Sequence, residues 1–453
     1  MHRYFRLVRT SYGVVETVTA CLATLVAGLS LLLPIDFAWT ADTTTLQLDL
    51  LAYSLPRAIA AGALVAVIVA VMATTVNHAL AAWGSALCGI TIMLINHLIG
   101  HRGDPGVSLP TLNFIDSLSG GILLGGIAVA VLHGRMQVFG WTLGGLGSVV
   151  IGAAMPTGHI DEVLEADRPM HWPATDSPPL WLIELTVALV ALGTLVNRHR
   201  TGVERRSVEL PMAPILAGLL FVTITLFGAE WLTRRADDTA DIALAVAAIV
   251  VAGLIAAMLL PRRDGTLILL AVSLSAVGGA LMPAWLPGWA AAPLVALTGF
   301  GILLGFRRPA PMATLVLLAM LALGNALTAA AVGHERTRAA TISVLLAVLA
   351  GYCFGSAAPR YNPTRVLGLS IVFVPSIVPA LRDRVSRGDF TDVTVDGGHW
   401  YVCQVPMASS PIPSWTALAV TTGCIVGLIA LRRWRTPTPN RTVETAESGE
   451  ERE

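Results

Sequence analysis

The chain has 453 residues, of which 55% are hydrophobic and only 13% are charged, and its mean hydropathy is +0.72. Soluble domains carry about 25% charged residues, so this excess of apolar residues indicates a protein that is solvated by lipid. The net charge is zero, which argues against nucleic acid as a partner, and the absence of lysine excludes a lysine-dependent phosphate-binding loop and therefore an ATP-driven pump.

Apolar runs repeat along the chain with short polar breaks between them. Each run is long enough to cross about 30 Å of hydrocarbon as a helix. The predicted fold is therefore an all-α polytopic membrane protein of about 14 transmembrane helices, arranged as two six-helix bundles plus two extra central spans. The spans are expected at 12–34, 57–76, 80–100, 117–133, 137–156, 180–197, 211–232, 240–260, 266–285, 288–306, 312–332, 340–358, 365–381 and 414–431.

Arginines mark every second break between the predicted spans, as in NRHRTGVERR at 197–206 and FRRP at 306–309. The positive-inside rule places these breaks in the cytoplasm. Both termini are then cytoplasmic, in an inner or plasma membrane. The predicted parts are an N-terminal six-span bundle (1–197), a cytoplasmic loop with two inserted spans (198–262), a C-terminal six-span bundle (263–435) and a disordered cytoplasmic tail (436–453).

A long outer loop is predicted at 382–413, just before the last span. Its sequence FTDVTVDGGHWYVCQV places β-branched and aromatic residues on both sides of a Gly-Gly pair. This pattern predicts a β-hairpin. A folded element outside the membrane could bind a protein partner, so the loop is a candidate partner site. Membrane lipid is the other expected partner.

Small residues recur every fourth position in two neighbouring predicted spans. The fourth span carries Ser117, Gly121 and Gly125, and the fifth span carries Gly140, Gly144, Ser148 and Gly152, followed by Pro156. Such ridges allow helix backbones to approach closely in lipid. They predict tight packing of these two neighbours and, in a transporter, a seam that slides or rocks.

Two acidic residues in the predicted spans are candidate proton or substrate sites. Glu16 lies about one turn inside the first span, where a partly desolvated carboxyl suits proton binding. The alternative is a structural partner of Arg9. Asp116 opens the fourth span, where it is either functional or a partner of the helix dipole.

Three polar side chains complete the set of candidates. Asn96 and His97 end the third span in MLINHLIGH, where the imidazole could relay protons or simply lie at the membrane interface. Asn325 lies deep in the eleventh span, as a contact between helices or with a ligand.

Enzymatic motifs are missing from the sequence. It contains no HExxH, CxxC or GxSxG motif, and no cofactor or metal ion is predicted. A membrane-embedded transferase would need paired acids in its first outer loop, and Asp36, Asp42 and Asp49 are spaced without such a pairing. The prediction is a protein that is not an enzyme.

Local motifs resemble the major facilitator superfamily, specifically its fourteen-span drug/proton antiporter branch. VETVTACLAT in the first span resembles the acidic signature of that branch, with Glu16 at the acidic position. HALAAWGSAL resembles its Gly-x-Leu-Ala-Asp-Arg-x-Gly loop at Leu80, Ala81 and Gly84, although the Asp and Arg are absent. The glycine-rich fourth and fifth spans resemble its antiporter motif, which in the family ends in Gly-Pro.

The resemblance implies a secondary active transporter with a substrate cavity between two halves, lined or gated by the first, fourth and fifth spans. Glu16 would exchange protons, and the few polar residues in the spans favour export of an amphipathic or hydrophobic small molecule. The missing loop charges leave open an alternative, a non-transporting accessory or assembly subunit on a degenerate transporter fold.

Overall fold

The computed structural model describes most of the chain. The described residues are 2–33, 45–100, 108–154, 177–199, 212–235, 239–261, 264–281, 287–328, 335–357, 359, 361–382, 390–395, 398–403 and 411–434.

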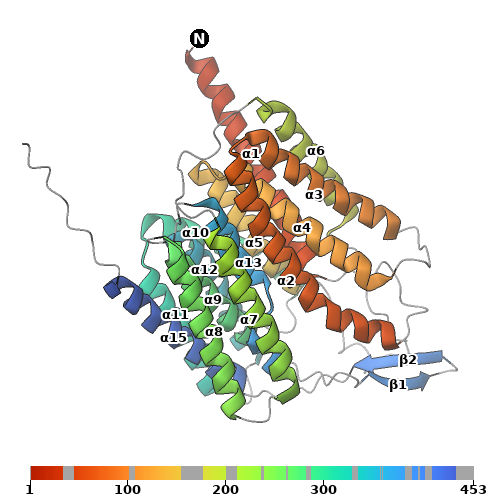
Figure 1. Cartoon of the computed structure of the whole chain (residues 1–453), viewed down its shortest axis with the longest axis vertical. Helices are drawn as coiled ribbons and strands as arrows, with labels where there is room; N and C mark the ends of the chain where they lie inside the picture. Colours follow the sequence, from red (N-terminus) through yellow and green to blue (C-terminus); the bar gives the residue numbers. More distant parts are fainter. Residues whose placement is uncertain are drawn as a thin grey trace, which may run out of the picture.

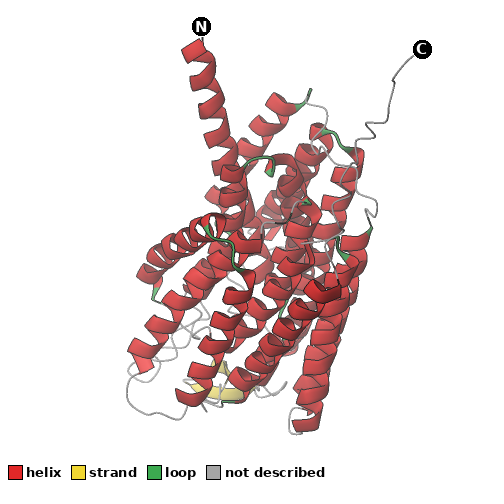
Figure 2. Cartoon of the chain, turned by 90° about the vertical axis from the view of Figure 1, so that its left-hand side faces the viewer, coloured by secondary structure: helices red, strands yellow, loops and turns green. Residues whose placement is uncertain are grey.

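Helices dominate the described residues, and the predicted class, an all-α polytopic membrane protein, is confirmed (Figures 1 and 2). Thirteen of the described helices are long and apolar enough to cross a membrane. The elements are α1 (His2–Leu32), α2 (Thr45–Val76), α3 (Ala79–Gly100), α4 (Leu109–Val131), α5 (Arg135–Ala154), α6 (Leu180–Asn197), α7 (Ala213–Arg235), α8 (Thr239–Leu259), α9 (Asp264–Leu281), η2 (Gly288–Ala290), α10 (Ala291–Arg307), α11 (Pro311–Thr328), α12 (Glu335–Ala357), α13 (Asn362–Phe373), α14 (Ile377–Arg382), β1 (Phe390–Val395), β2 (Gly398–Cys403) and α15 (Ile412–Trp434).

The predicted span at 365–381 is not one helix but two, α13 and α14, separated by a short extended segment. Val374 has φ −66° and ψ 127° and is followed by Pro375. A residue before proline is pushed out of the helical region, and proline itself lacks the N–H that would continue the ladder. The sequence therefore breaks this span in its middle.

Three helices, α1, α2 and α4, begin well before their predicted spans. Helix α2 starts at Thr45, so Pro56, just ahead of the predicted span at 57–76, lies inside the helix. Helix α4 starts after Ser108, with Pro110 in its first turn. Asp116 therefore lies about two turns inside α4, and its interpretation as an acid at the helix N-terminus is wrong.

One pattern of helix packing occurs twice in the molecule. In the first set, α1 packs on α4, α5 and α6, α2 packs on α4, and α3 packs on α4 and α6. In the second set, α9 packs on α12, α13 and α15, α10 packs on α12, and α11 packs on α12 and α15. Helices α1 to α5 of the first set thus correspond to α9 to α13 of the second set, and α6 corresponds to α15.

The two sets meet mainly along two seams, α5 against α10 and α2 against α13, with smaller contacts of α4 and α5 with α13 and of α5 with α12. The remaining long helices, α7 and α8, pack on each other outside these sets. Helix α7 lies against α2, α13 and α14, and α8 lies against α9 and α15 (Figure 1). Helix α7 therefore covers the α2–α13 seam.

The two small-residue ridges serve different partners, so the prediction that they pack on each other is wrong. On α4, a Cβ at Gly121 or Gly125 would overlap carbonyl oxygens of α2. On α5, a Cβ at Gly140 or Gly144 would overlap carbonyl oxygens of α1, while Gly152 faces the side chain of Leu33, the residue just after α1. Pro156 lies outside the described residues.

The predicted hairpin in the loop at 382–413 is confirmed. Strands β1 and β2 pair antiparallel, with Val395 opposite Gly398. The hairpin lies at the end of the bundle opposite the first turn of α1 (Figures 1 and 2). We call these two ends the hairpin side and the N-terminal side. Residues 383–389, 396–397 and 404–410 of the loop, and the tail from 436, lie outside the described residues.

Candidate functional site

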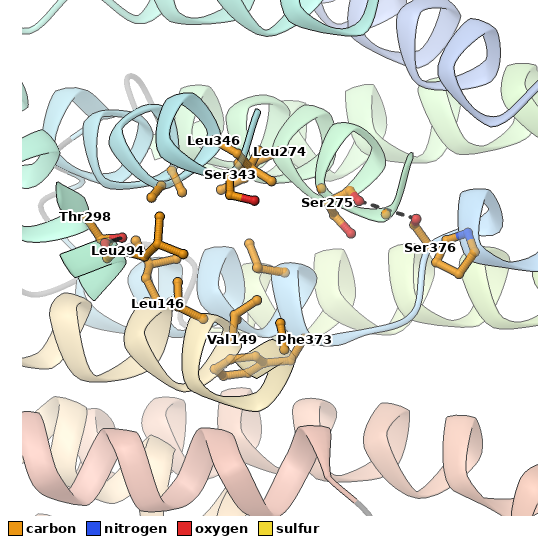
Figure 3. A pocket seen from close by; sticks show the side chains of 18 of the residues that line it. Leu146, Val149, Leu274, Ser275, Leu294, Thr298, Ser343, Leu346, Phe373 and Ser376 are labelled. Carbon is orange, nitrogen blue, oxygen red and sulfur yellow. Dashed lines mark hydrogen bonds between the residues drawn. The ribbon is translucent and has the colours of Figure 1, made fainter. Parts of the chain in front are cut away.

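A cavity of about 350 Å³ lies where the two helix sets meet (Figure 3). Its walls are the second half of α5, the later turns of α9, the first turns of α10, the middle of α12 and the break between α13 and α14. The lining side chains that Figure 3 labels are Leu146, Val149, Leu274, Ser275, Leu294, Thr298, Ser343, Leu346, Phe373 and Ser376.

No ionisable side chain occurs among the described residues that line this cavity. Most of its wall is aliphatic, and its polar groups are four hydroxyls and the backbone of the helix break. The hydroxyls of Thr298 and Ser343 donate to carbonyls of their own helices, at 2.9 Å to Leu294 and 2.8 Å to Ala339. Their protons are therefore occupied, while the oxygen lone pairs can still accept.

The helix break adds backbone acceptors to the same wall. Pro375, which lines the cavity, has no N–H, so the hydrogen-bond ladder of α13 stops here and carbonyls at the end of this helix lack a helical donor. The C-terminal end of α13 also carries the negative end of its helix dipole. Ser376 lies in the break and donates to the Ser275 carbonyl on α9 at 3.5 Å (Figure 3). The cavity therefore suits a neutral, mainly apolar molecule that donates a hydrogen bond.

Glu16 lies in a polar cluster on the N-terminal side. Its Oε2 is 3.0 Å from Nε2 of His133, in the turn between α4 and α5, and accepts a hydrogen bond of 3.3 Å from Gln137 Nε2 on α5. Glu16 is 7% exposed, whereas the side chain of His133 is 29% exposed. The cluster joins a buried carboxyl to an imidazole that reaches the surface.

The Glu16 cluster does not line the cavity. Gln137 and Val149 lie on the same helix, and twelve residues of α-helix span about 18 Å. Of the three helices expected to line or gate the cavity, only α5 lines it among the described residues, so for α1 and α4 a gating role stays a prediction. Both pack behind α5 and α2 through their glycine contacts.

His97 and Asp116 form a second ionisable pair, between α3 and α4. Nε2 of His97 lies 3.3 Å from Oδ1 of Asp116, and their side chains are 0% and 1% exposed. The buried position of His97 contradicts one of its two interpretations, a histidine exposed at the membrane interface, and leaves the proton relay as a prediction. The adjacent Asn96 donates to the Leu112 carbonyl at 3.0 Å. The pair lies toward the hairpin side but apart from the cavity wall.

Two further polar contacts join neighbouring helices. Asn325 donates from Nδ2 to the Ser414 hydroxyl at 2.8 Å, which ties α11 to α15. Arg57 makes two contacts with Glu230, from Nε at 2.8 Å and from Nη2 at 3.1 Å, which tie α2 to α7. In this structure Asn325 is a contact between helices, which was one of its two interpretations.

The sequence-based candidates missed the cavity residues, although the sequence carried one signal for them. The run IVFVPSIVPALR contains Pro375 and Pro379 inside a predicted span. A hydrophobic segment interrupted by proline is a good pointer to a transporter binding site. The serines and the threonine of the wall carry no comparable signal, because isolated hydroxyls are common in membrane helices.

Comparison with known proteins gives low similarity only. No family model matches the chain, and no curated protein matches it. Among solved structures, it is similar to the E. coli fucose:proton symporter FucP (13% identity, TM-score 0.43, covering 95% of this chain and 99% of that chain) and to a major facilitator superfamily transporter, FucP, in the outward conformation (14%, 0.41, 93% and 99%). It is also similar to an auto-inhibited POT family peptide transporter (13%, 0.42, 94% and 98%).

Proposed function

We propose that this protein is a secondary active transporter that carries a neutral, mainly apolar small molecule through the cavity between its two helix sets. The observation that carries the proposal is the cavity itself: about 350 Å³, free of ionisable side chains among its described residues, and bounded by a broken membrane helix. Transporter sites commonly lie at the junction of two repeats beside discontinuous helices.

The repeated packing of the two helix sets supports an alternating-access cycle. We interpret α1–α6 and α9–α15 as two six-span bundles, with α7 and α8 inserted between them in sequence. Two bundles that meet along two narrow seams can rock against each other without unfolding. The cavity would then open to each face in turn.

We propose proton-coupled export, with Glu16 as the proton-binding residue. Its carboxyl is buried toward the N-terminal side of the bundle. His133, whose side chain is 29% exposed, gives the carboxyl a route to solvent on that side. Because the Glu16 cluster contacts the first half of α5 through Gln137 and the cavity lies against its second half, proton and substrate would be coupled through movement of α5 and not by direct contact.

Vesicles with the reconstituted protein test the cavity, with a panel of neutral lipophilic dyes as substrates. Gly278 lines the cavity, and a Cβ built there meets nothing within 4 Å. Gly278→Leu should therefore fill the cavity without breaking the helix packing, and lower transport of any accepted dye by about tenfold or more. Gly324→Leu is the matched control, since Gly324 also has open space at its Cβ but lies away from the cavity.

The coupling role of Glu16 has its own test in the same vesicles. Glu16→Gln keeps the size and one acceptor oxygen but cannot bind and release a proton at neutral pH. Transport driven by a pH gradient should be lost, while dye exchange without a gradient continues. If no dye is transported and a second protein co-purifies in fixed ratio, the alternative of an accessory or assembly subunit is favoured instead.

A further inference from the structure

A second hollow lies against the cavity on the outer surface of the α5–α10 seam. This groove has a volume of about 830 Å³ and is formed by Phe139, Leu143 and Ile151 of α5 and by residues from Gly288 to Leu303 of η2 and α10. Every described residue that lines it is glycine, alanine or a larger apolar residue. Both helices are predicted membrane spans, so the groove faces the hydrocarbon of the bilayer.

Only a thin wall of side chains separates the groove from the cavity. On α5, Leu146 and Val150 face the cavity, whereas Leu143 faces the groove; on α10, Leu294 and Thr298 face the cavity. In the wall between the groove and the cavity, a glycine of each helix faces a larger side chain of the other helix.

Each helix contributes one glycine to that wall. A Cβ at Gly147 of α5 would lie 3.8 Å from both Cγ atoms of Val295 on α10. A Cβ at Gly299 of α10 would lie 3.5 Å from Leu143 Cδ1 and from Phe139 Cζ on α5. These are ordinary van der Waals distances, so the two helices touch through side chains over a glycine and not through interlocked backbones.

No hydrogen bond or ion pair joins α5 to α10 within the described part of the chain. In water, separating such apolar surfaces would be costly. In a bilayer it is not, because lipid chains replace the lost contacts and no hydrophobic driving force holds the helices together. The seam can therefore part toward the lipid by moving a few side chains.

Resting on the transport function proposed above, we propose that the substrate is a membrane-dissolved molecule with an alkyl chain and an uncharged, hydrogen-bond-donating head group, which enters the cavity sideways through the α5–α10 seam. The groove accepts the chain from the bilayer. The cavity then offers the head group the acceptors at Thr298 and Ser343 and at the end of α13 beside Pro375. A charged head group would find no ionic partner among the described lining residues.

Photolabelling of the full chain in phosphatidylcholine nanodiscs tests this route, with a hexadecanol that carries a diazirine in mid-chain as the probe. Leu274 and Leu346 line only the cavity and report its occupancy, while Phe300 and Leu303 line only the groove. Mass spectrometry resolves the labelled residues. The wild-type protein should be labelled at both sets.

Substitutions at the seam should separate the two sets of labels. Gly147→Val adds bulk against Val295, so labelling of the cavity residues should fall about tenfold, while labelling of the groove residues is kept. Adding Val295→Gly to that variant returns the space and should restore cavity labelling. This double variant shows that a loss in the single variant comes from the closed seam and not from misfolding.

Two results would overturn lateral entry. One is unchanged cavity labelling in the Gly147→Val variant while Gly278→Leu abolishes it, which would leave the cavity as the binding site with a different entrance. The other is labelling of the wild type at the groove residues alone. If Gly278→Leu also leaves cavity labelling unchanged, the proposed substrate site itself fails, so the two proposals can be judged separately.

Discussion

The two seams between the helix sets are related by the repeated packing but differ in how they are held. The α2–α13 seam has a hydrogen bond of 3.3 Å from the Ser370 hydroxyl to the Ala63 carbonyl, and α7 covers it. Helix α7 is joined in turn to α2 by the Arg57–Glu230 pair. The α5–α10 seam has neither a covering helix nor a polar tie among the described residues.

This difference gives the inserted pair α7 and α8 a physical role. Ala60, Ala63, Val222 and Val374 form a buried cluster that joins α2, α7 and the helix break. Helix α7 therefore closes one seam to lipid and packs against the break, while α8 packs on α7, α9 and α15. The other seam is left as the side on which the two sets can part.

Cross-linking the α5–α10 seam should have the largest effect. The change is Gly147→Cys with Val295→Cys, in a chain whose own five cysteines are replaced by alanine. Oxidation joins the helices across the seam, so transport of a lipophilic substrate should stop except in the uncross-linked fraction. Transport in vesicles before and after oxidation measures this.

Reductant provides the control for the cross-link, because it should restore transport in the same sample. Each single-cysteine variant should be insensitive to oxidant. Full transport in a sample that is completely cross-linked would show that the bare seam does not open, and the contrast between the seams would then have no functional meaning.

Replacing the proline at the helix break, so that the helix can continue, should have the next largest effect. Pro375→Ala restores an N–H, so α13 can continue toward α14 and the carbonyls at the end of α13 are no longer free to accept in the cavity wall. Binding of the photolabel in the cavity should fall by about fivefold, with thermal stability unchanged or raised, since each lost hydrogen bond to the head group costs about 1 kcal/mol.

Pro379→Ala is the matched control for the break. Pro379 also lines the cavity, but it lies in the first turn of α14, where a backbone N–H has no helical partner. Its replacement should leave the break and the binding of the photolabel unchanged. Equal losses in both variants would indicate a general effect of removing a proline and not a role for the free carbonyls at the end of α13.

The sequence predicted the membrane fold well because its signals are local. Lipid forces backbone groups to pair inside each helix, so apolar runs reveal the spans, and Gly-Gly between β-branched residues revealed the hairpin. The helix starts at Thr45 and Leu109 were missed because the first turns of these two helices, ahead of the apolar runs, contain polar residues. Partners of the glycine ridges were also missed, since spacing shows that a face is small but not which helix covers it.

The site was harder to predict because it is built from tertiary contacts between unremarkable residues. Ionisable residues drew attention to Glu16, His97 and Asp116, which the structure places in two clusters away from the cavity. The cavity walls are leucines, valines and isolated hydroxyls, whose roles depend on which helices meet. Only Pro375 marked the place in the sequence.

Breaking the ion pair on the covered seam should have the smallest effect. Arg57→Gln removes the two contacts with Glu230, whose side chain is 17% exposed against 43% for Arg57. A half-exposed pair contributes about 0.5–1 kcal/mol, so the midpoint of thermal unfolding should fall by about 1–2 °C. A double-mutant cycle with Glu230→Gln isolates the contribution of the pair.

The same variant shows whether one ion pair or the whole of α7 seals the covered seam. Since the cluster of Ala60, Ala63, Val222 and Val374 remains in place, photolabelling around α2 and α7 should stay at background in Arg57→Gln, and lateral entry should still depend on Gly147. Strong new labelling beside Val222 would mean that a single polar tie kept this seam closed. The two seams would then differ by that tie alone, and the packing of the inserted helices would not be what directs the substrate to the other side.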